Sequence, residues 1–103
     1  MRILIVCGSG ASSGFIAQRM RKAAKAKKIE ARIDARSETE LAEHLAGLDV
    51  LLVGPHLAYA YAQLSEQAQA HGVKTALIDQ KIYGALDGAA AFELALSLAP
   101  QAR

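Results

Sequence analysis

Cysteine and aromatic residues are scarce in this chain, and both scarcities limit what the protein can be. Among the 103 residues there are one cysteine, three tyrosines, two phenylalanines and no tryptophan. A single cysteine cannot form a disulfide within the chain, which fits a reducing compartment. Because 52% of the residues are hydrophobic, a chain of this length can bury one core without disulfides. We therefore expect a single domain spanning residues 1–103.

Long hydrophobic runs and a strong excess of one charge are also missing. No apolar run approaches the ~20 residues of a membrane span, and the apolar residues 3–7 are too few for a signal-peptide core of roughly 7–15 residues. The formal net charge is +2, although residues 19–28 hold six cations and no acid. We interpret this basic stretch as a solvated helix face rather than a nucleic-acid site, with an acidic protein partner as the alternative. The expectation is a soluble cytoplasmic protein without direct membrane insertion.

Apolar residues alternate between the spacing of strands and the spacing of helices along the chain. Strict alternation of strand and helix implies an α/β domain of three layers, with helices on both faces of a parallel sheet. The first and third strands are nearly all apolar and suit the centre, whereas the second alternates like an edge strand, so right-handed crossovers favour the order 2-1-3-4. Strands are expected at 2–6, 29–35, 50–53 and 75–78, helices at 13–27, 41–48, 57–71 and 89–98, and a loop between the last strand and the last helix.

Two local patterns sharpen these expectations. The spacing in the first helix predicts that Phe15, Ile16 and Met20 face the core. Residues 37–40 read Ser-Glu-Thr-Glu, a capping box that predicts the start of the second helix.

Cys7 is the residue whose position indicates chemistry. It ends an apolar strand, and residues 8–14 consist only of glycine, serine and alanine before the helical pattern begins. The free N–H groups and dipole of the following helix favour a thiolate, and the same groups hold phosphate. Cys7 is thus predicted to be nucleophile and phosphate carrier; the alternative is a buried structural cysteine before an ordinary turn. The predicted phosphate-binding residues are Gly8, Ser9, Gly10, Ala11, Ser12 and Ser13.

Three kinds of phosphate loop compete for this segment. A nucleotide P-loop needs Gly-Lys-Ser/Thr, and the first lysine is Lys22, so that reading is excluded. The glycine-rich fingerprint of dinucleotide-binding folds is matched only in part, by Gly8 and Gly10. Its third small residue does not fall at the required spacing. The Cys-x5-Arg loop of cysteine phosphatases fits best, yet Ser13 stands where that loop has arginine. Without a guanidinium the charge of a hydrolytic transition state is poorly met, so we expect the loop to hold a phosphoryl group and hand it on.

The Cys7 loop, the segment Gly-Pro-His-Leu-Ala-Tyr at 54–59 and the segment Ile-Asp-Gln-Lys-Ile-Tyr-Gly-Ala-Leu-Asp-Gly at 78–88 resemble the IIB components of the lactose/cellobiose/chitobiose branch of the bacterial sugar phosphotransferase system. The resemblance spans essentially the whole chain. It implies a phosphotransferase with a four-stranded parallel sheet like that of low-molecular-weight tyrosine phosphatases. It also implies that a phosphohistidine of IIA phosphorylates Cys7, and that Cys7 passes the group to a sugar held by membrane-bound IIC.

Other candidate residues have less distinctive positions. His56 and Asp79 are expected at the sheet edge that carries Cys7, as are Tyr59 and Tyr83, which are candidates for the site wall or for partner contacts. We interpret His56 as a residue near a helix start, Asp79 as a turn residue rather than a general acid, and the Asp87–Gly88 pair as a turn or cap. No spacing of ligands indicates a metal, no cofactor is expected, and a monomer suffices for a carrier that docks two partners in turn.

Two other functions stay open at this point. One is a small cysteine phosphatase or arsenate reductase, which the missing arginine and the lack of further cysteines disfavour. The other is a regulatory module that binds an anion without catalysis, in which Cys7 is only structural.

Overall fold

The computed structural model describes residues 1–7 and 11–98. Its sheet has four parallel strands in the order β2-β1-β3-β4, as the apolar pattern predicted. β1 is therefore a central strand, paired with β2 on one side and β3 on the other. The strands are β1 (Arg2–Cys7), β2 (Arg32–Ser37), β3 (Val50–Val53) and β4 (Lys74–Leu77).

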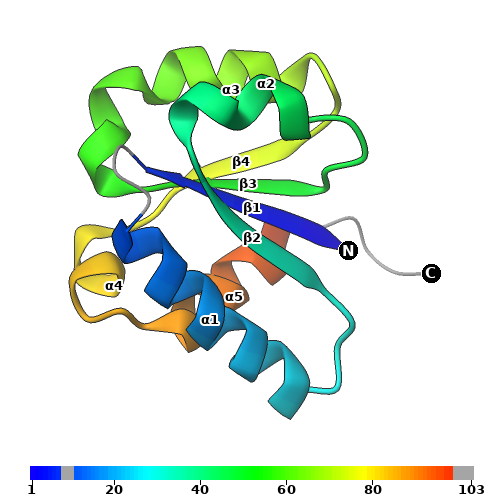
Figure 1. Ribbon diagram of the computed structural model, residues 1–103, viewed down its shortest axis with the longest axis vertical. Coiled ribbons are helices and arrows are strands. Elements are labelled where there is room, and N and C mark those ends of the chain that lie inside the picture. The colour runs from blue at the N-terminus through cyan, green and yellow to red at the C-terminus, as the bar shows by residue number, and fades with distance from the viewer. Residues whose placement is uncertain (8–10, 99–103) are drawn as a thin grey trace.

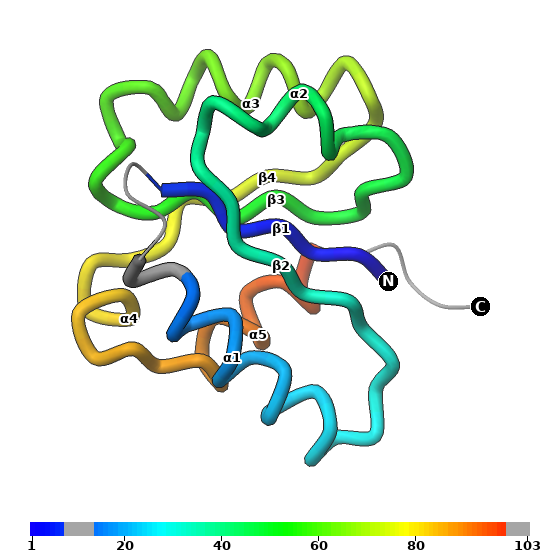
Figure 2. Tube along the Cα trace, in the orientation of Figure 1, coloured from blue at the N-terminus to red at the C-terminus, as the bar shows by residue number. Residues whose placement is uncertain are grey.

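Helices cover both faces of the sheet, which confirms the three-layer α/β architecture (Figure 1). α1, α4 and α5 lie on one face, and α2 and α3 lie on the other. The carboxyl ends of the strands point to one side of the molecule, where a 3-10 helix and α4 lie next to the end of β1 (Figure 2). The helices are α1 (Ala11–Ala26), α2 (Leu41–His44), α3 (Tyr61–Gln69), α4 (Gln80–Gly84) and α5 (Gly88–Leu98), with 3-10 helices η1 (Glu38–Glu40) and η2 (Pro55–Ala60).

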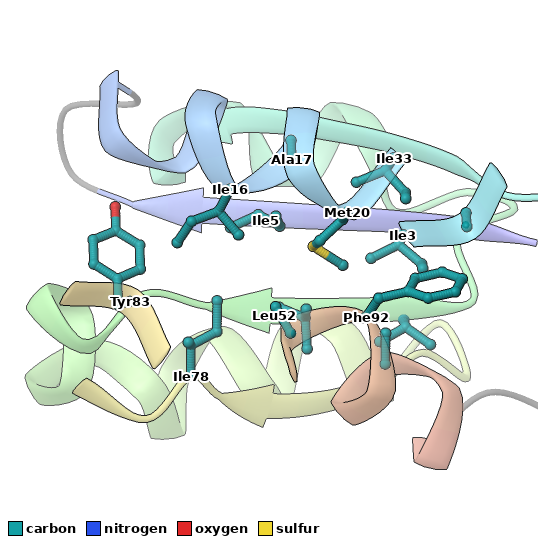
Figure 3. Packing of buried hydrophobic residues seen from close by; sticks show 14 residues of the cluster. Ile3, Ile5, Ile16, Ala17, Met20, Ile33, Leu52, Ile78, Tyr83 and Phe92 are labelled. Atoms are coloured by element: carbon teal, nitrogen blue, oxygen red, sulfur yellow. The ribbon is translucent and has the colours of Figure 1, made fainter. Parts of the chain in front are cut away.

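Alternate residues of β1 and β3 point into two separate cores. Ile3, Ile5 and Leu52 pack under α1, α4 and α5, together with Phe92 and Tyr83 at opposite ends of that core (Figure 3). The residues between them in β1 and β3 pack under α2 and α3. Burial on both faces explains why these strands read as continuous apolar runs. The second core consists of Leu4, Val6, Leu41, Leu45, Leu48, Leu51, Val53, Leu57, Leu64, Ala68 and Val73.

One prediction about the first helix is wrong. Ile16 and Met20 are fully buried, as expected, but Phe15 is 59% exposed. The buried positions of α1 recur every three or four residues through Ala17 and Ala24, and Phe15 precedes that stripe by one residue. The helix also begins at Ala11, two residues earlier than its apolar pattern indicated.

The capping box is present, but the helix it precedes is shorter than predicted. The hydroxyl of Ser37 accepts a hydrogen bond from the N–H of Thr39, and the carboxylate of Glu40 accepts one from the N–H of Ser37. The box starts η1, which continues into the single turn of α2. The predicted helix 41–48 stops at His44, and Gly47, with a positive φ of 77°, lies in the turn that leads to β3. The leucines expected on that helix are nevertheless buried.

The segment between β4 and α5 contains a helix that the apolar pattern did not reveal. α4 has only five residues, too few for a periodic signal. The helix expected at 57–71 is divided, because η2 occupies its first residues and α3 spans only Tyr61–Gln69. Two strands are shifted by a few residues: β2 begins at Arg32 rather than 29, and β4 spans Lys74–Leu77 rather than 75–78.

Candidate functional site

Cys7 is the last residue of β1, at the carboxyl edge of the sheet, and only 2% of it is exposed. Its backbone pairs with Ser37 of β2. α1 begins at Ala11, so a helix N-terminus follows the cysteine closely in the chain. The predicted phosphate-binding residues Gly8, Ser9 and Gly10 lie outside the described residues. The other three, Ala11, Ser12 and Ser13, form the first turn of α1.

Gly54 brings the end of β3 against Cys7. Its N–H donates a 2.9 Å hydrogen bond to the carbonyl of Val6, which continues the ladder past the last paired residues of the two strands. A β-carbon at Gly54 would lie 3.3 Å from Cβ of Cys7 and 3.5 Å from Cε1 of Tyr83. The missing side chain at Gly54 therefore lets both Cys7 and the ring of Tyr83 lie close to this part of the backbone. Pro55 then starts η2 at its first position, where the missing N–H costs nothing.

Tyr83 reaches this point from α4, although it is far from Cys7 in the sequence. Only 5% of it is exposed, and its hydroxyl is directed toward the carboxyl end of β1 (Figure 3). The ring of His56, in η2, meets it edge to face, with centroids 5.2 Å apart and an angle of 69° between the planes. This geometry is favourable for two aromatic rings. Cys7, Gly54, His56 and Tyr83 therefore form one cluster, which we call the Cys7 cluster.

The two aspartates of the last segment cap helices. The carboxylate of Asp79 accepts a 2.7 Å hydrogen bond from the N–H of Lys81 and caps α4. The carboxylate of Asp87 accepts a 3.0 Å hydrogen bond from the N–H of Ala90, in the first turn of α5. The interpretation of Asp87 as a cap is confirmed, whereas Asp79, expected in a turn, caps a helix that was not predicted. Asp79 supports the site indirectly, because the helix that it caps carries Tyr83.

Tyr59 is largely exposed to solvent. It lies in the same 3-10 helix as His56, but 82% of it is exposed. Its role as a partner contact stays a prediction. The basic stretch 19–28 lies along the outer side of α1 and the following turn, where every cation is exposed. Lys27 forms a 2.6 Å ion pair with Glu93 of α5, and the acidic partner that we considered for this stretch also stays a prediction.

Two features of the site were not predicted from the sequence. The first is the close approach at Gly54, for which the only signal was a Gly-Pro pair directly after a buried strand. The second is Gly88, where a β-carbon would collide with Arg19 of α1 and lie 2.7 Å from the N–H nitrogen of Met20. Gly88 thus allows α5 to rest on the backbone of α1.

Among residues 1–7 and 11–98, no three histidine, cysteine, aspartate or glutamate side chains gather closely enough to bind a metal. Within the same ranges, no helix has the length and apolar character needed to span a membrane.

Comparison with known proteins gives one consistent result. Residues 2–94 match the family model described as "PTS system, Lactose/Cellobiose specific IIB subunit". The oligo-beta-mannoside-specific EIIB component of Bacillus subtilis is 32% identical over 97 residues, which cover 94% of each chain. The galactose-specific EIIB component of Lactococcus lactis subsp. cremoris is 31% identical over 91 residues, or 84% of each chain.

Solved structures agree with these sequence matches. The cellobiose-specific IIB component from Borrelia burgdorferi has a TM-score of 0.78 and 36% identity, covering 95% of this chain and 90% of that one. The lactose-specific IIB domain from Streptococcus pneumoniae has a TM-score of 0.85 over 95% of this chain and 96% of that one, and at 14% identity it shows the shared fold alone. The chain therefore belongs to the lactose/cellobiose-specific IIB family of the sugar phosphotransferase system, whose members are phosphotransferases.

Proposed function

We propose that this protein carries a phosphoryl group on Cys7, taking it from a phosphohistidine of a IIA protein and giving it to a sugar held by a membrane IIC protein. The observation that carries the proposal is the position of the chain's one cysteine, at the carboxyl end of the central strand β1 and just before the 16-residue helix α1. Helix N-termini attract thiolates and phosphate groups alike. Membership in a family of IIB components supports partners of the IIA and IIC kinds, and the direction of transfer is part of the proposal.

Each transfer exchanges one bond at phosphorus for another. The Cys7 thiolate attacks the phosphorus of the phosphohistidine in line, an S–P bond forms, and the P–N bond breaks with its electron pair returning to the imidazole. A sugar hydroxyl then attacks the same phosphorus, an O–P bond forms, and the S–P bond breaks to regenerate the thiolate while the hydroxyl proton passes to a base. Positioning and electrostatic stabilisation do most of the work in phosphoryl transfer.

A carrier should keep its phosphoryl group until the acceptor arrives, and two features favour retention over hydrolysis. Ser13 stands where phosphatase loops place an arginine, so the charge of a hydrolytic transition state meets no guanidinium. A phosphatase also needs a general acid. The carboxylate of Asp79 is already engaged as the cap of α4.

The proposal is tested by incubating the protein with a phosphorylated IIA protein of the same system and measuring its intact mass. We expect a gain of one phosphoryl group, located on Cys7 by peptide mapping, and no gain in the Cys7→Ser variant. A folded wild-type protein that gains no phosphoryl group on Cys7 contradicts the carrier role. Rapid hydrolysis of p-nitrophenyl phosphate by the wild type, lost in Cys7→Ser, would instead identify a cysteine phosphatase.

A further inference from the structure

Tyr83 is held at the Cys7 cluster by several contacts. A ring carbon of Tyr83 and Cβ of Cys7 both lie within 3.5 Å of the point where a β-carbon of Gly54 would stand. The ring is 5% exposed and its edge-to-face partner His56 comes from η2. Its backbone N–H donates a 3.0 Å hydrogen bond to the carbonyl of Asp79, the residue that caps α4. The helix cap and the backbone bond thus position residue 83 on α4, and His56 packs against its ring.

The hydroxyl of Tyr83 is directed toward the residue that we propose to be phosphorylated. Tyr83 lies at the end of its core opposite Phe92, with its oxygen directed toward the carboxyl end of β1 (Figure 3). That end of β1 is Cys7. A tyrosine hydroxyl donates a hydrogen bond without carrying a charge.

The segment that follows Cys7 has no side chain that can carry a positive charge. Residues 8–14 contain no lysine, arginine or histidine, so their side chains contribute at most serine hydroxyls. A phosphoryl group on sulfur carries negative charge and three acceptor oxygens. A neutral donor from another element would therefore complete its coordination without the cation that phosphatase loops use.

We propose that Tyr83 is a binding residue of the phosphoryl site, and that its hydroxyl donates a hydrogen bond to the phosphoryl group carried by Cys7. This inference rests on the carrier role proposed above. A hydrogen bond from this buried and packed residue to the phosphoryl group favours the phosphorylated over the free protein. A neutral donor stabilises the bound group but adds no full positive charge for a hydrolytic transition state, which suits a carrier.

The test removes the hydroxyl and keeps the ring. In Tyr83→Phe we expect the equilibrium constant for phosphoryl transfer from phosphorylated IIA to fall about tenfold, as for loss of a hydrogen bond to a charged group. The phosphorus NMR signal of the phosphocysteine should shift as well. Tyr61→Phe is the matched control, because its hydroxyl lies 3.5 Å from Oγ1 of Thr75 beneath α3 and should leave both quantities unchanged.

The outcomes separate this inference from the carrier role. If the wild type is phosphorylated and Tyr83→Phe has the same equilibrium constant and the same phosphorus signal, the hydrogen bond is refuted while the carrier role stands. If the wild type itself gains no phosphoryl group, the carrier role fails first.

A second measurement leaves Tyr83 in place. With Tyr59 and Tyr61 changed to phenylalanine, position 83 holds the only tyrosine of the chain, and fluorotyrosine incorporation makes it a single reporter. We expect its fluorine NMR signal to move when Cys7 is phosphorylated. An unmoved signal in the phosphorylated protein would overturn the proposal even if Tyr83→Phe failed to fold.

Discussion

The two faces of the sheet are packed in different ways. Under α2 and α3, every buried core residue is aliphatic. Under α1, α4 and α5, the core also contains methionine, tyrosine and phenylalanine. On that second face a glycine is needed where α5 rests on α1, and another where Tyr83 meets the carboxyl edge of the sheet.

The two faces therefore contain two kinds of position. At one kind any side chain of similar volume is tolerated, and at the other only one residue type fits. An aliphatic core accepts another side chain of similar size, because its free energy depends mainly on the buried volume and area. Where the backbone of a glycine makes the contact, any added side chain must displace a neighbour. The face with the second kind of contact is also the face that presents Tyr83 to Cys7, so substitutions on the two faces should differ in their effect on phosphoryl transfer as well as on stability.

The largest effect on stability is expected from Gly88→Ala. A β-carbon there would collide with Arg19 and lie 2.6 Å from its carbonyl carbon, so α5 must move away from α1. We expect the free energy of unfolding, measured in urea, to fall by about 3 kcal/mol. The control is Gly14→Ala in α1, where a β-carbon meets nothing within 4 Å and should stabilise by up to about 1 kcal/mol. Equal free energies for the two variants would show that α1 and α5 are not held at contact distance.

The next effect, from Gly54→Ala, should appear mainly in function. The new methyl would lie 3.3 Å from Cβ of Cys7, so Cys7 or the backbone at position 54 must shift by a few tenths of an ångström, whereas its 3.5 Å distance from Cε1 of Tyr83 is ordinary contact. We expect about a tenfold slower single-turnover phosphoryl transfer from IIA and a loss of about 1 kcal/mol in stability.

Gly84→Ala is the matched control for Gly54→Ala, because a β-carbon at Gly84 has no neighbour within 4 Å. It should transfer at the wild-type rate. If Gly54→Ala also transfers at that rate, the close approach of η2 to Cys7 has no part in the reaction.

The sequence predicted well which strands are buried and in which order they lie. It predicted poorly which residues approach one another closely. The strand order followed from where apolar runs were continuous, because a central strand is buried on both faces and an edge strand is not. The cap residues Ser37 and Asp87 were also recognised, since capping depends on neighbouring residues only, whereas Asp79 was expected in a turn and caps a helix that was not predicted. These features are local or statistical in character, and they sufficed to place Cys7 at the carboxyl edge.

The cluster around Cys7 depends on residues far apart in the chain. Tyr83 and Gly54 are separated by two helices and a strand, and no periodicity links them. α4 is shorter than two turns, so it leaves no repeating apolar pattern. Phe15 illustrates the converse limit: a single large apolar residue beside a buried stripe is indistinguishable from a member of it until the helix is seen packed.

A smaller effect is expected at Asp79. A role as helix cap and a role as general acid predict different results there. Asp79→Ala removes the acceptor for the N–H of Lys81 and should lower the free energy of unfolding by about 1 kcal/mol. Asp79→Asn keeps an acceptor oxygen and should lower the free energy of unfolding by only a few tenths of a kcal/mol. Because an amide cannot donate a carboxylic proton, phosphoryl transfer by Asp79→Asn at the wild-type rate supports the cap alone. A large loss of transfer in a stable Asp79→Asn protein would assign the carboxylate to the chemistry.

The smallest effect is expected from Leu64→Met in α3, on the aliphatic face. Leu64 is 6% exposed and packs only in the core beneath α2 and α3, and methionine has nearly the same volume with a more adaptable side chain. The free energy of unfolding should fall by less than about 1.5 kcal/mol, with no change in the rate of phosphoryl transfer from IIA. A slower transfer in this variant would mean that packing under α3 reaches the Cys7 cluster through η2, and that the two faces of the sheet are energetically coupled at the site. An unchanged rate beside the tenfold loss expected for Gly54→Ala would confine the determinants of transfer to the carboxyl edge and the face that carries α4.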